Sequence, residues 1–294
     1  MYTRVTVPLD GSALAEAALV PAAAVARHHR APVRVVSVRP ASRQHVDLVS
    51  YHQALAQDGI LGPGWSSEVL ADDGHGVAGA IRDSLGGSDE LLCLATHGHN
   101  AVGSLVLGSV AEDVLAGNSD PVLLVGPGFD PTTTVTFKTV VVCLDGSPHS
   151  EQVIPAAAAW AEEMGMSITL LHVAPRPAPP NAELPPEWAQ EAEERQWEAQ
   201  AKRIAYLEKV AAGFAPRSVT WDILESESPA VAICQFAGTV PGAVVAMATR
   251  GNAGLRRVAL GSVAMQVAHQ CPVPILVVGS HAAIADAAGG ERGQ

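Results

Sequence analysis

Ala-Thr-His-Gly at residues 95–98 is followed, after nine intervening residues, by Gly-Ser at residues 108–109, and this arrangement recurs as Ala-Thr-Arg-Gly at 248–251 and Gly-Ser at 261–262. A glycine loop that leads into a helix start exposes main-chain amides, which bind phosphate well. The sequence therefore predicts two pockets for a phosphate-bearing ligand.

The duplication extends well beyond these loops. Val-Pro-Leu-Asp-Gly-Ser at residues 7–12 recurs as Val-Cys-Leu-Asp-Gly-Ser at 142–147, which is 135 positions later. The Gly-Ser motif and the apolar stretch 121–126 recur 153 positions later. The change of 18 positions indicates an insertion between the motifs of the second copy.

Each copy alternates short Val/Leu/Ile strands with Ala-rich helical segments, a pattern typical of a parallel sheet that helices cover on both faces. The first helix is predicted over 12–29 and its counterpart over 148–164, where Ser147 caps and Pro148 opens the helix. We expect α/β domains at 1–130 and 136–281, followed by a flexible tail at 282–294. Strands are expected at 4–9, 33–38, 69–72, 90–96 and 122–125, and again at 139–144, 167–173, 219–225, 243–248 and 275–278.

The insertion in the second copy has two parts. Six prolines between 175 and 186 predict a stiff surface segment, and 187–212 reads as a long amphipathic helix. Trp197, Ile204 and Leu207 share one side of it, with Ala211. We expect this side to pack on its own domain, in preference to docking a partner.

Composition excludes several classes of function. The formal net charge of −12 and the pI of about 5.3 argue against a protein that coats nucleic acid or an anionic membrane. The chain start lacks a signal-peptide pattern, and no apolar run is long enough for a membrane span. The four cysteines form no Cys-x-x-Cys pair, so we expect buried, reduced thiols in a cytoplasmic protein.

The chemistry is expected at the carboxyl ends of the strands, where ligands bind in open parallel sheets. Asp10 and Asp145 end first strands, and each carboxylate is expected to accept a ribose or adenine donor or to reach phosphate through Mg²⁺. The alternative is an Asp-Gly-Ser turn that opens a helix and binds nothing. Gly98 and Gly251 are expected to adopt positive φ, and the Gly-Ser helix starts to present free amides.

The two loops differ in charge. The first has no lysine or arginine, whereas the second copy adds three arginines, Arg250, Arg256 and Arg257. We therefore expect a triphosphate to bind more tightly in the second half.

The sequence lacks the motifs of other nucleotide-binding folds, of nucleophilic catalysis and of metal binding. The chain has neither a Gly-x4-Gly-Lys-Ser/Thr loop nor a Gly-x-Gly-x-x-Gly after its first strand. The motifs pair no nucleophile with a base, so we expect no enzyme, or at most slow ATP hydrolysis. His97-x-His99 and His28-His29 have no third ligand at a recurring spacing, so we expect no metal site and assign His28-His29 to a polar helix end.

The ordered motifs resemble those of the universal stress protein family in its tandem two-domain form. They are the Pro-Leu-Asp-Gly-Ser opening, the strands before Val38 and Val173, the Gly-nine-Gly-Ser loops and the Pro-Val-Leu-Leu-Val-Gly ending. The resemblance implies a doubly wound five-stranded parallel sheet per domain, in the order 3-2-1-4-5, with ATP where the order reverses. It also implies domain pairing through the last strands, which one chain can satisfy, and a homodimer.

Ligand contacts carry over from the family position by position. In the first copy they fall on Pro8, Leu9, Asp10, Val38, Ala95, His97, Gly98, Gly108, Ser109 and Val110. In the second they fall on Cys143, Leu144, Asp145, Val173, Ala248, Arg250, Gly251, Gly261, Ser262 and Val263.

One departure from the family bears on ligand binding. The family loop opens with glycine, whereas both copies have alanine, Ala95 and Ala248. Alanine is strained there if the position needs positive φ and fits if it simply ends a strand. The expected function is a nucleotide-occupancy-dependent stress regulator. The alternatives are an ATP-independent dimeric scaffold that acts through protein partners and, more weakly, a slow ATP hydrolase or a sulfur or adenylate transferase.

Overall fold

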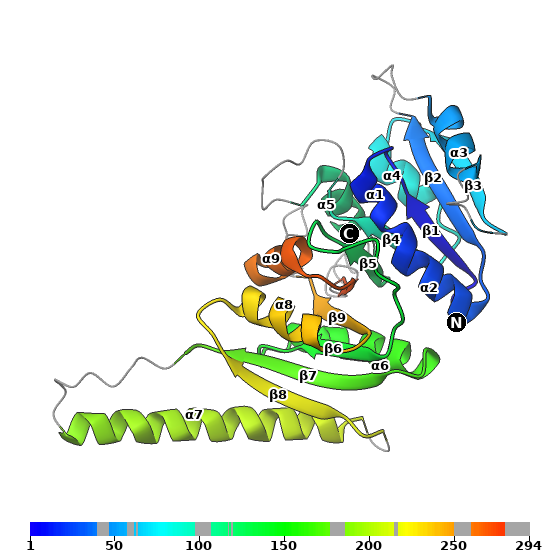
Figure 1. Cartoon of the computed structure of the whole chain (residues 1–294). Coiled ribbons are helices and arrows are strands. Elements are labelled where there is room, and N and C mark those ends of the chain that lie inside the picture. Colours follow the sequence, from blue (N-terminus) through cyan, green and yellow to red (C-terminus); the bar gives the residue numbers. More distant parts are fainter. Residues whose placement is uncertain are drawn as a thin grey trace, which may run out of the picture.

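A single ten-stranded sheet organises the chain in the computed structural model, which describes residues 1–39, 47–57, 62, 64–97, 107–116, 118, 120–176, 186–214, 217–249 and 260–279. The strand order is β3-β2-β1-β4-β5-β10-β9-β6-β7-β8 (Figure 1), so each half has the predicted order 3-2-1-4-5. The strands are β1 (Arg4–Pro8), β2 (Val33–Arg39), β3 (Ser66–Ala71), β4 (Glu90–Ala95), β5 (Val122–Val125), β6 (Thr139–Cys143), β7 (Ser167–Ala174), β8 (Thr220–Glu225), β9 (Ala243–Ala248) and β10 (Ile275–Val278).

The two halves join through their last strands. β5 and β10 pair antiparallel, with Leu123 opposite Leu276 at the centre of the register, whereas the strands within each half pair parallel. The predicted pairing through the last strands is confirmed, and it takes place within one chain. The tail at 282–294 lies outside the described residues.

Helices cover both faces of the sheet and bury a separate apolar layer on each. One layer packs residues of α1 (Ala13–Ala17), α2 (Leu19–His29), α3 (Leu48–Gln57), α6 (Ile154–Glu163) and α7 (Pro186–Ala212) against the sheet. The other uses α4 (Gly76–Asp83), α5 (Ser109–Ala116), α8 (Pro229–Thr239) and α9 (Ser262–Gln270). Near-continuous burial of the central strands explains their Val/Leu/Ile composition.

The first helix of each half is shorter than predicted. The segment 12–29 divides into α1 and α2 at Ala18, because Pro21 has no amide hydrogen to donate to the Ala17 carbonyl one turn earlier. In the second half a 3-10 turn, Ser150–Val153, precedes α6, so the helix proper does not begin at Pro148. Helix α3 was not predicted; it buries Leu48, His52 and Leu55.

The long helix α7 packs on its domain along only part of its length. Leu207 is fully buried, and Tyr206 and Val210 pack against the core beside it. Trp197, two turns or more closer to the helix start, is 75% exposed. Figure 1 shows the amino-terminal part of α7 running past the end of the sheet. The expectation that Trp197 packs on its own domain was therefore wrong, because the sheet ends before that part of the helix.

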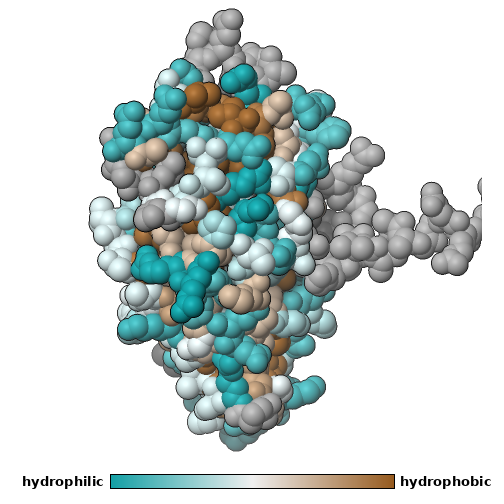
Figure 2. Space-filling view, turned by 90° about the vertical axis from the view of Figure 1, so that its right-hand side faces the viewer, coloured by the Kyte–Doolittle hydropathy of each residue, from teal (hydrophilic) through white to brown (hydrophobic). Residues whose placement is uncertain are grey.

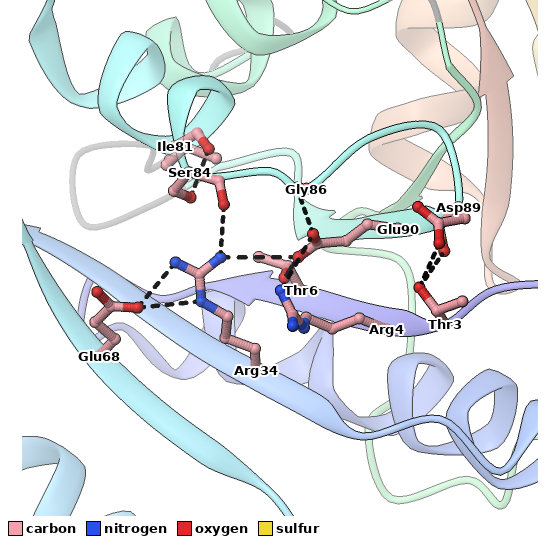
Figure 3. Close-up of polar contacts among 10 residues, drawn as sticks. All are labelled: Thr3, Arg4, Thr6, Arg34, Glu68, Ile81, Ser84, Gly86, Asp89 and Glu90. Carbon is pink, nitrogen blue, oxygen red and sulfur yellow. Dashed lines mark hydrogen bonds and ion pairs between the residues drawn. The ribbon is translucent and has the colours of Figure 1, made fainter.

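The amino ends of the first-half strands are held together by charge. The buried Glu90 carboxylate accepts a hydrogen bond from the Gly86 amide at 2.6 Å and another from the Thr6 hydroxyl. Arg4 lies 3.6 Å and Arg34 3.8 Å from its oxygens (Figure 3). A buried charge needs such partners, so this end of the sheet serves as a structural anchor.

Candidate functional site

The candidate site begins at the same turn in both halves, directly after the first strand. Asp10 Oδ1 accepts hydrogen bonds from the Ser12 amide at 3.0 Å and the Ser12 hydroxyl at 2.6 Å. Asp145 Oδ1 accepts from the Ser147 amide at 2.9 Å and the Ser147 hydroxyl at 2.6 Å. Both carboxylates are exposed, so each turn presents a fixed negative group at the carboxyl end of the sheet.

Glycine is required inside both turns. Gly11 and Gly146 each adopt a φ of +85°. L-residues with a side chain are strained in this left-handed region. The positive φ that was expected at Gly98 and Gly251 concerns positions outside the described residues.

The second strand of each half supports the turn from below. The Ser37 hydroxyl donates to the Leu9 carbonyl at 2.7 Å, and in the second half His172 Nδ1 donates to the Leu144 carbonyl at 2.9 Å. Partial burial lowers the pKa of His172, which favours the neutral ring. The adjoining predicted contacts, Val38 and Val173, are half-buried beside these groups. Pro8 and Cys143 end the first strands.

Ala95 and Ala248 are the last residues of β4 and β9. Ala95 pairs with Val125 and Ala248 with Val278 in the parallel ladders. Both alanines therefore occupy extended backbone, where a methyl group causes no strain. Of the residues that follow them, Gly98, Arg250 and Gly251 lie outside the described residues, as do Arg256 and Arg257.

Each Gly-Ser motif starts a helix, α5 in the first half and α9 in the second. The Gly108 amide donates to the Thr96 carbonyl at 2.8 Å. The expectation that this amide is free for a ligand was therefore wrong. A Cβ on Gly108 would lie 3.0 Å from that carbonyl, which explains the glycine. At the other start, Gly261 is the residue before α9 and, like Gly108, has no side chain that could cap the helix. The first amides of α9 have no partner within the helix.

The threonines that follow the two strand-end alanines differ in their hydrogen bonding. The buried Thr96 hydroxyl hydrogen-bonds His97 Nδ1 at 2.9 Å. Its counterpart, the Thr249 hydroxyl, is buried and has no hydrogen-bond partner among the residues that the structure describes. An unpaired buried hydroxyl is costly, so a ligand that pairs with Thr249 would gain a hydrogen bond at a position where the first-half hydroxyl is already paired. The remaining predicted contacts, Ser109 and Ser262, are exposed at the helix starts, and Val110 and Val263 are half-buried behind them.

Hydrogen bonding sets the charge of the second carboxylate. Partial burial by itself raises the pKa of Asp145, but the hydrogen bonds from Ser147 and Ser150 outweigh it and hold the pKa below its ordinary value. The carboxylate is thus ionised at neutral pH. It can accept hydrogen bonds or bind a cation, and it is a poor proton donor.

A tyrosine near each carboxylate was missed by the sequence reasoning. The Tyr51 hydroxyl of α3 donates to Glu16 at 2.9 Å, and the charge of Asp10 further disfavours the phenolate. Tyr206 of α7 occupies the corresponding place beside Glu151 and Asp145. Burial is the largest cause of the raised pKa of both tyrosines, so both hydroxyls stay protonated. Glu16 and Glu151 recur 135 positions apart, but Tyr51 and Tyr206 stand 155 positions apart, so the repeat reveals the glutamates and not their tyrosine partners.

The structure does not support a metal site or a membrane-spanning helix in the residues that it describes. Within the described ranges, no group of three or more potential ligands can hold a metal. The assignment of His28-His29 to a polar helix end is wrong for His29, which is buried edge-to-face against Tyr2 with ring centroids 5.4 Å apart.

In the described part of the chain, no helix is long and apolar enough to span a membrane. Figure 2 shows a largely hydrophilic surface with apolar side chains gathered toward the first-half end.

A cavity of about 480 Å³ lies beside α1 and α2, where Leu19, Val20 and Trp65 line it. Its lining is mostly apolar and also includes Ala13 and Glu16, which follow the first Asp-Gly-Ser turn. A second one, of about 290 Å³, lies between the halves beside Tyr2 and Trp160. Neither contains the predicted ligand contacts, so the candidate site rests on the repeated turn, strand end and helix start.

Comparisons with known proteins point to one family. The model of the universal stress protein family matches residues 136–279. A universal stress protein of Mycolicibacterium smegmatis is 27% identical over 298 residues, which cover 93% of this chain and 96% of that protein. The universal stress protein in the QAH/OAS sulfhydrylase 3′ region of Thermus aquaticus is 32% identical over 142 residues, 48% of this chain and 98% of the relative.

Solved structures share the whole architecture. A functionally unknown protein of Pseudomonas aeruginosa has a TM-score of 0.62 at 16% identity, covering 97% of this chain and 95% of that one. A universal stress protein of Archaeoglobus fulgidus has a TM-score of 0.57 at 17% identity, covering 95% and 99%. At this identity the likeness concerns the fold alone.

Proposed function

Because the chain belongs to the universal stress protein family, we propose that it binds ATP at the carboxyl ends of its two half-sheets and works as a stress-response regulator whose state depends on nucleotide occupancy. One observation carries the proposal. The same exposed Asp-Gly-Ser carboxylate stands after the first strand in both halves, and each half also has a Gly-Ser helix start after its fourth strand.

Each part of the site suits one part of the nucleotide. The half-buried Val38 and Val173 offer apolar surface for the adenine ring. Asp10 and Asp145 have carboxylate oxygens that can accept ribose hydroxyls. The starts of α5 and α9 offer amides and the positive end of a helix dipole to the phosphates. When Mg²⁺ accompanies the nucleotide, it screens the phosphate charge, and an exposed aspartate is the ligand type that it prefers.

The second half is the tighter site in this proposal. Its buried Thr249 hydroxyl has no hydrogen-bond partner within the described part of the chain. In the first half the matching Thr96 hydroxyl is paired with His97, and the Gly108 amide is paired with the Thr96 carbonyl. A ligand at the first site must therefore displace hydrogen bonds that a ligand at the second site does not meet.

Binding without efficient turnover fits the hydroxyls at the turns. The Ser12 and Ser147 hydroxyls each donate a hydrogen bond to an aspartate oxygen. Each also accepts a hydrogen bond from a backbone amide at the start of the next helix, at 3.1 Å in both halves. Both hydroxyls are used within their own turns, where they cap the start of the next helix, and the proposal gives neither a catalytic part. We propose at most slow ATP hydrolysis, together with a homodimer of chains in the cytoplasm.

Isothermal titration with Mg·ATP tests the proposal. Asp145→Ala is expected to abolish the tighter of two binding events, and Asp10→Ala the weaker one. Asp130→Ala is the matched control, because Asp130 forms the same turn with Thr132, at 2.9 Å to its amide and 2.7 Å to its hydroxyl, in the linker between the halves. This control should retain both events.

Two results would count against the proposal. Equal or reversed affinities of the two half-sites would remove the assigned asymmetry. No heat from the wild-type protein at millimolar nucleotide would remove ATP binding and favour the scaffold that works through protein partners. Phosphate release measured on the same samples tests the expectation of slow hydrolysis.

A further inference from the structure

Three of the four cysteines gather on one face of the second half. Cys143 ends β6, Cys234 lies in the middle of α8 and Cys271 follows the last residue of α9. All three are free, buried and members of the apolar layer between the sheet and these two helices. Cys93 belongs to the opposite layer, in the first half.

Packing of the two helices places Cys234 and Cys271 at the same contact between α8 and α9. Gly238 lies one helical turn after Cys234, on the same side of α8. A Cβ on Gly238 would lie 3.3 Å from the ring of Pro272, which follows Cys271 in the chain. The Cys271 amide donates to the Val267 carbonyl at 2.9 Å, so its backbone is fixed at the end of α9.

The two thiols differ in reactivity because they interact. A hydrogen bond from Cys271 lowers the pKa of Cys234, and the same bond, together with burial, raises the pKa of Cys271. Burial raises the pKa of the third thiol, Cys143. The thiolate is the nucleophilic form of cysteine, so Cys234 is the reactive member of the cluster. The described residues include no group of ligands that could hold a metal here.

We propose that Cys234 and Cys271 form a redox-active pair that a peroxide converts into an intrachain disulfide tying α8 to α9. The Cys234 thiolate attacks one peroxide oxygen, the O–O bond breaks, and hydroxide leaves and takes up a proton. The resulting Cys234 sulfenic acid is attacked by the Cys271 sulfur, which loses its proton; the S–O bond breaks, the S–S bond forms and a second water leaves. Two thiols are oxidised and one peroxide is reduced to two waters.

The pair is specific to the second half. The position that corresponds to Cys271 in the first copy is Asn118. Helix α9 runs from Ser262, at the candidate site, to the cysteine pair at its other end. The disulfide would therefore fix the carboxyl end of α9, the helix whose amino end is the proposed phosphate-binding site. Disulfides in reducing compartments are usually transient and redox-sensing.

Peptide mapping of the full-length wild-type protein tests the proposal. After excess hydrogen peroxide and alkylation, trypsin should yield residues 218–250 and 258–292 as one cross-linked species, which dithiothreitol separates. Cys143→Ser and Cys93→Ser should leave this species unchanged, whereas Cys234→Ser and Cys271→Ser should abolish it. Thermal melting of each variant reports whether it folds.

The wild-type map is decisive even if a variant misfolds. Free, alkylatable Cys234 and Cys271 after treatment with excess peroxide would overturn the proposal. A disulfide that joins Cys143 to either partner in place of the predicted pair would also overturn it, because the assigned helix-to-helix link would be absent.

Discussion

The two halves of the chain share the Asp-Gly-Ser turn at their carboxyl ends and differ at their amino ends. At the carboxyl ends, the Asp-Gly-Ser turns have the same hydrogen bonds and the same φ of +85° at Gly11 and Gly146. At the amino ends, the first half buries Glu90 among arginines, whereas the second half places Ala243 at the corresponding position. There the strands meet through hydroxyls, as between Thr169 and Thr220 at 2.9 Å.

The contrast shows which part of the repeat is constrained. An anchor at the amino ends only has to hold strands together, and either charges or hydroxyls achieve that. The turn at the carboxyl ends has to place a carboxylate next to a helix start, and the two copies solve this with the same three residues. A constraint beyond folding explains this better than folding alone.

The largest effect is expected at the amino end of the first half. Glu90→Ala removes a buried carboxylate and leaves the Thr6 hydroxyl and the Gly86 amide without their acceptor. Breaking a buried ion pair costs about 3 to 5 kcal/mol, and we expect a loss of unfolding free energy of that size in chemical denaturation. Hydrogen exchange should rise most in β1 and β4.

The control for Glu90 is Glu68→Ala. Glu68 pairs with the same Arg34, at 2.9 Å, but is 54% exposed. An exposed pair contributes about 1 kcal/mol or less. Equal losses for the two variants would mean that the Glu90 cluster does not anchor the first half.

The next effect concerns the helix by which the second half differs most from the first. Leu207→Ala should cost about 2 to 5 kcal/mol, because Leu207 is fully buried where α7 meets the core. Trp197→Ala should change stability by less than about 0.5 kcal/mol, because Trp197 is 75% exposed. Denaturant titration measures both, and a large loss for Trp197→Ala would show that the outer part of α7 packs on the molecule.

The strand order and the join between the halves were predictable from the sequence. Apolar strand patterns gave the parallel sheets, and the family resemblance gave the order and the pairing of β5 with β10. The structure also decides the question left open at Ala95 and Ala248, because both end strands. Local apolar patterns are therefore sufficient to predict the strands, and the motifs that carry the family resemblance are sufficient to predict their order.

Contacts between non-repeated segments were not predictable. Tyr51 and Tyr206 stand 155 positions apart, on helices of 10 and 27 residues, so comparing the copies at a fixed spacing does not align them. The Glu90 cluster depends on the register of β1, β2 and β4, which the sequence does not specify. The partner of the Gly108 amide likewise depends on how closely a strand end approaches a helix start.

A third test concerns the contact between the halves at Tyr2, whose hydroxyl accepts a hydrogen bond from Trp160 Nε1 at 2.6 Å. Tyr2→Phe leaves this nearly buried donor unpaired and should cost about 1 to 3 kcal/mol near neutral pH. A double-mutant cycle with Trp160→Phe isolates the bond. A coupling free energy near zero would show that the bond does not join the halves.

The pH dependence gives that bond a signature. Burial raises the pKa of Tyr2 from 10.0 to about 12, so the folded protein retains the proton at pH values where the unfolded chain loses it. The associated stability is complete below pH 10 and is lost as the pH rises through 12. The stability difference between wild type and Tyr2→Phe should therefore shrink over this interval, and a constant difference would contradict the assignment.

The smallest effect bears most directly on the shared turn. Gly11→Ala and Gly146→Ala each place a methyl group on a residue with a φ of +85°, and the expected cost is about 1 to 2 kcal/mol in either half. A Cβ on Gly146 meets no atom within 4 Å, so any loss there comes from backbone strain and not from a clash. Thermal denaturation of the two variants should give similar losses. A loss at one glycine and none at the other would show that the two turns are not held equally, and the case for a constraint common to both carboxyl ends would fail with it.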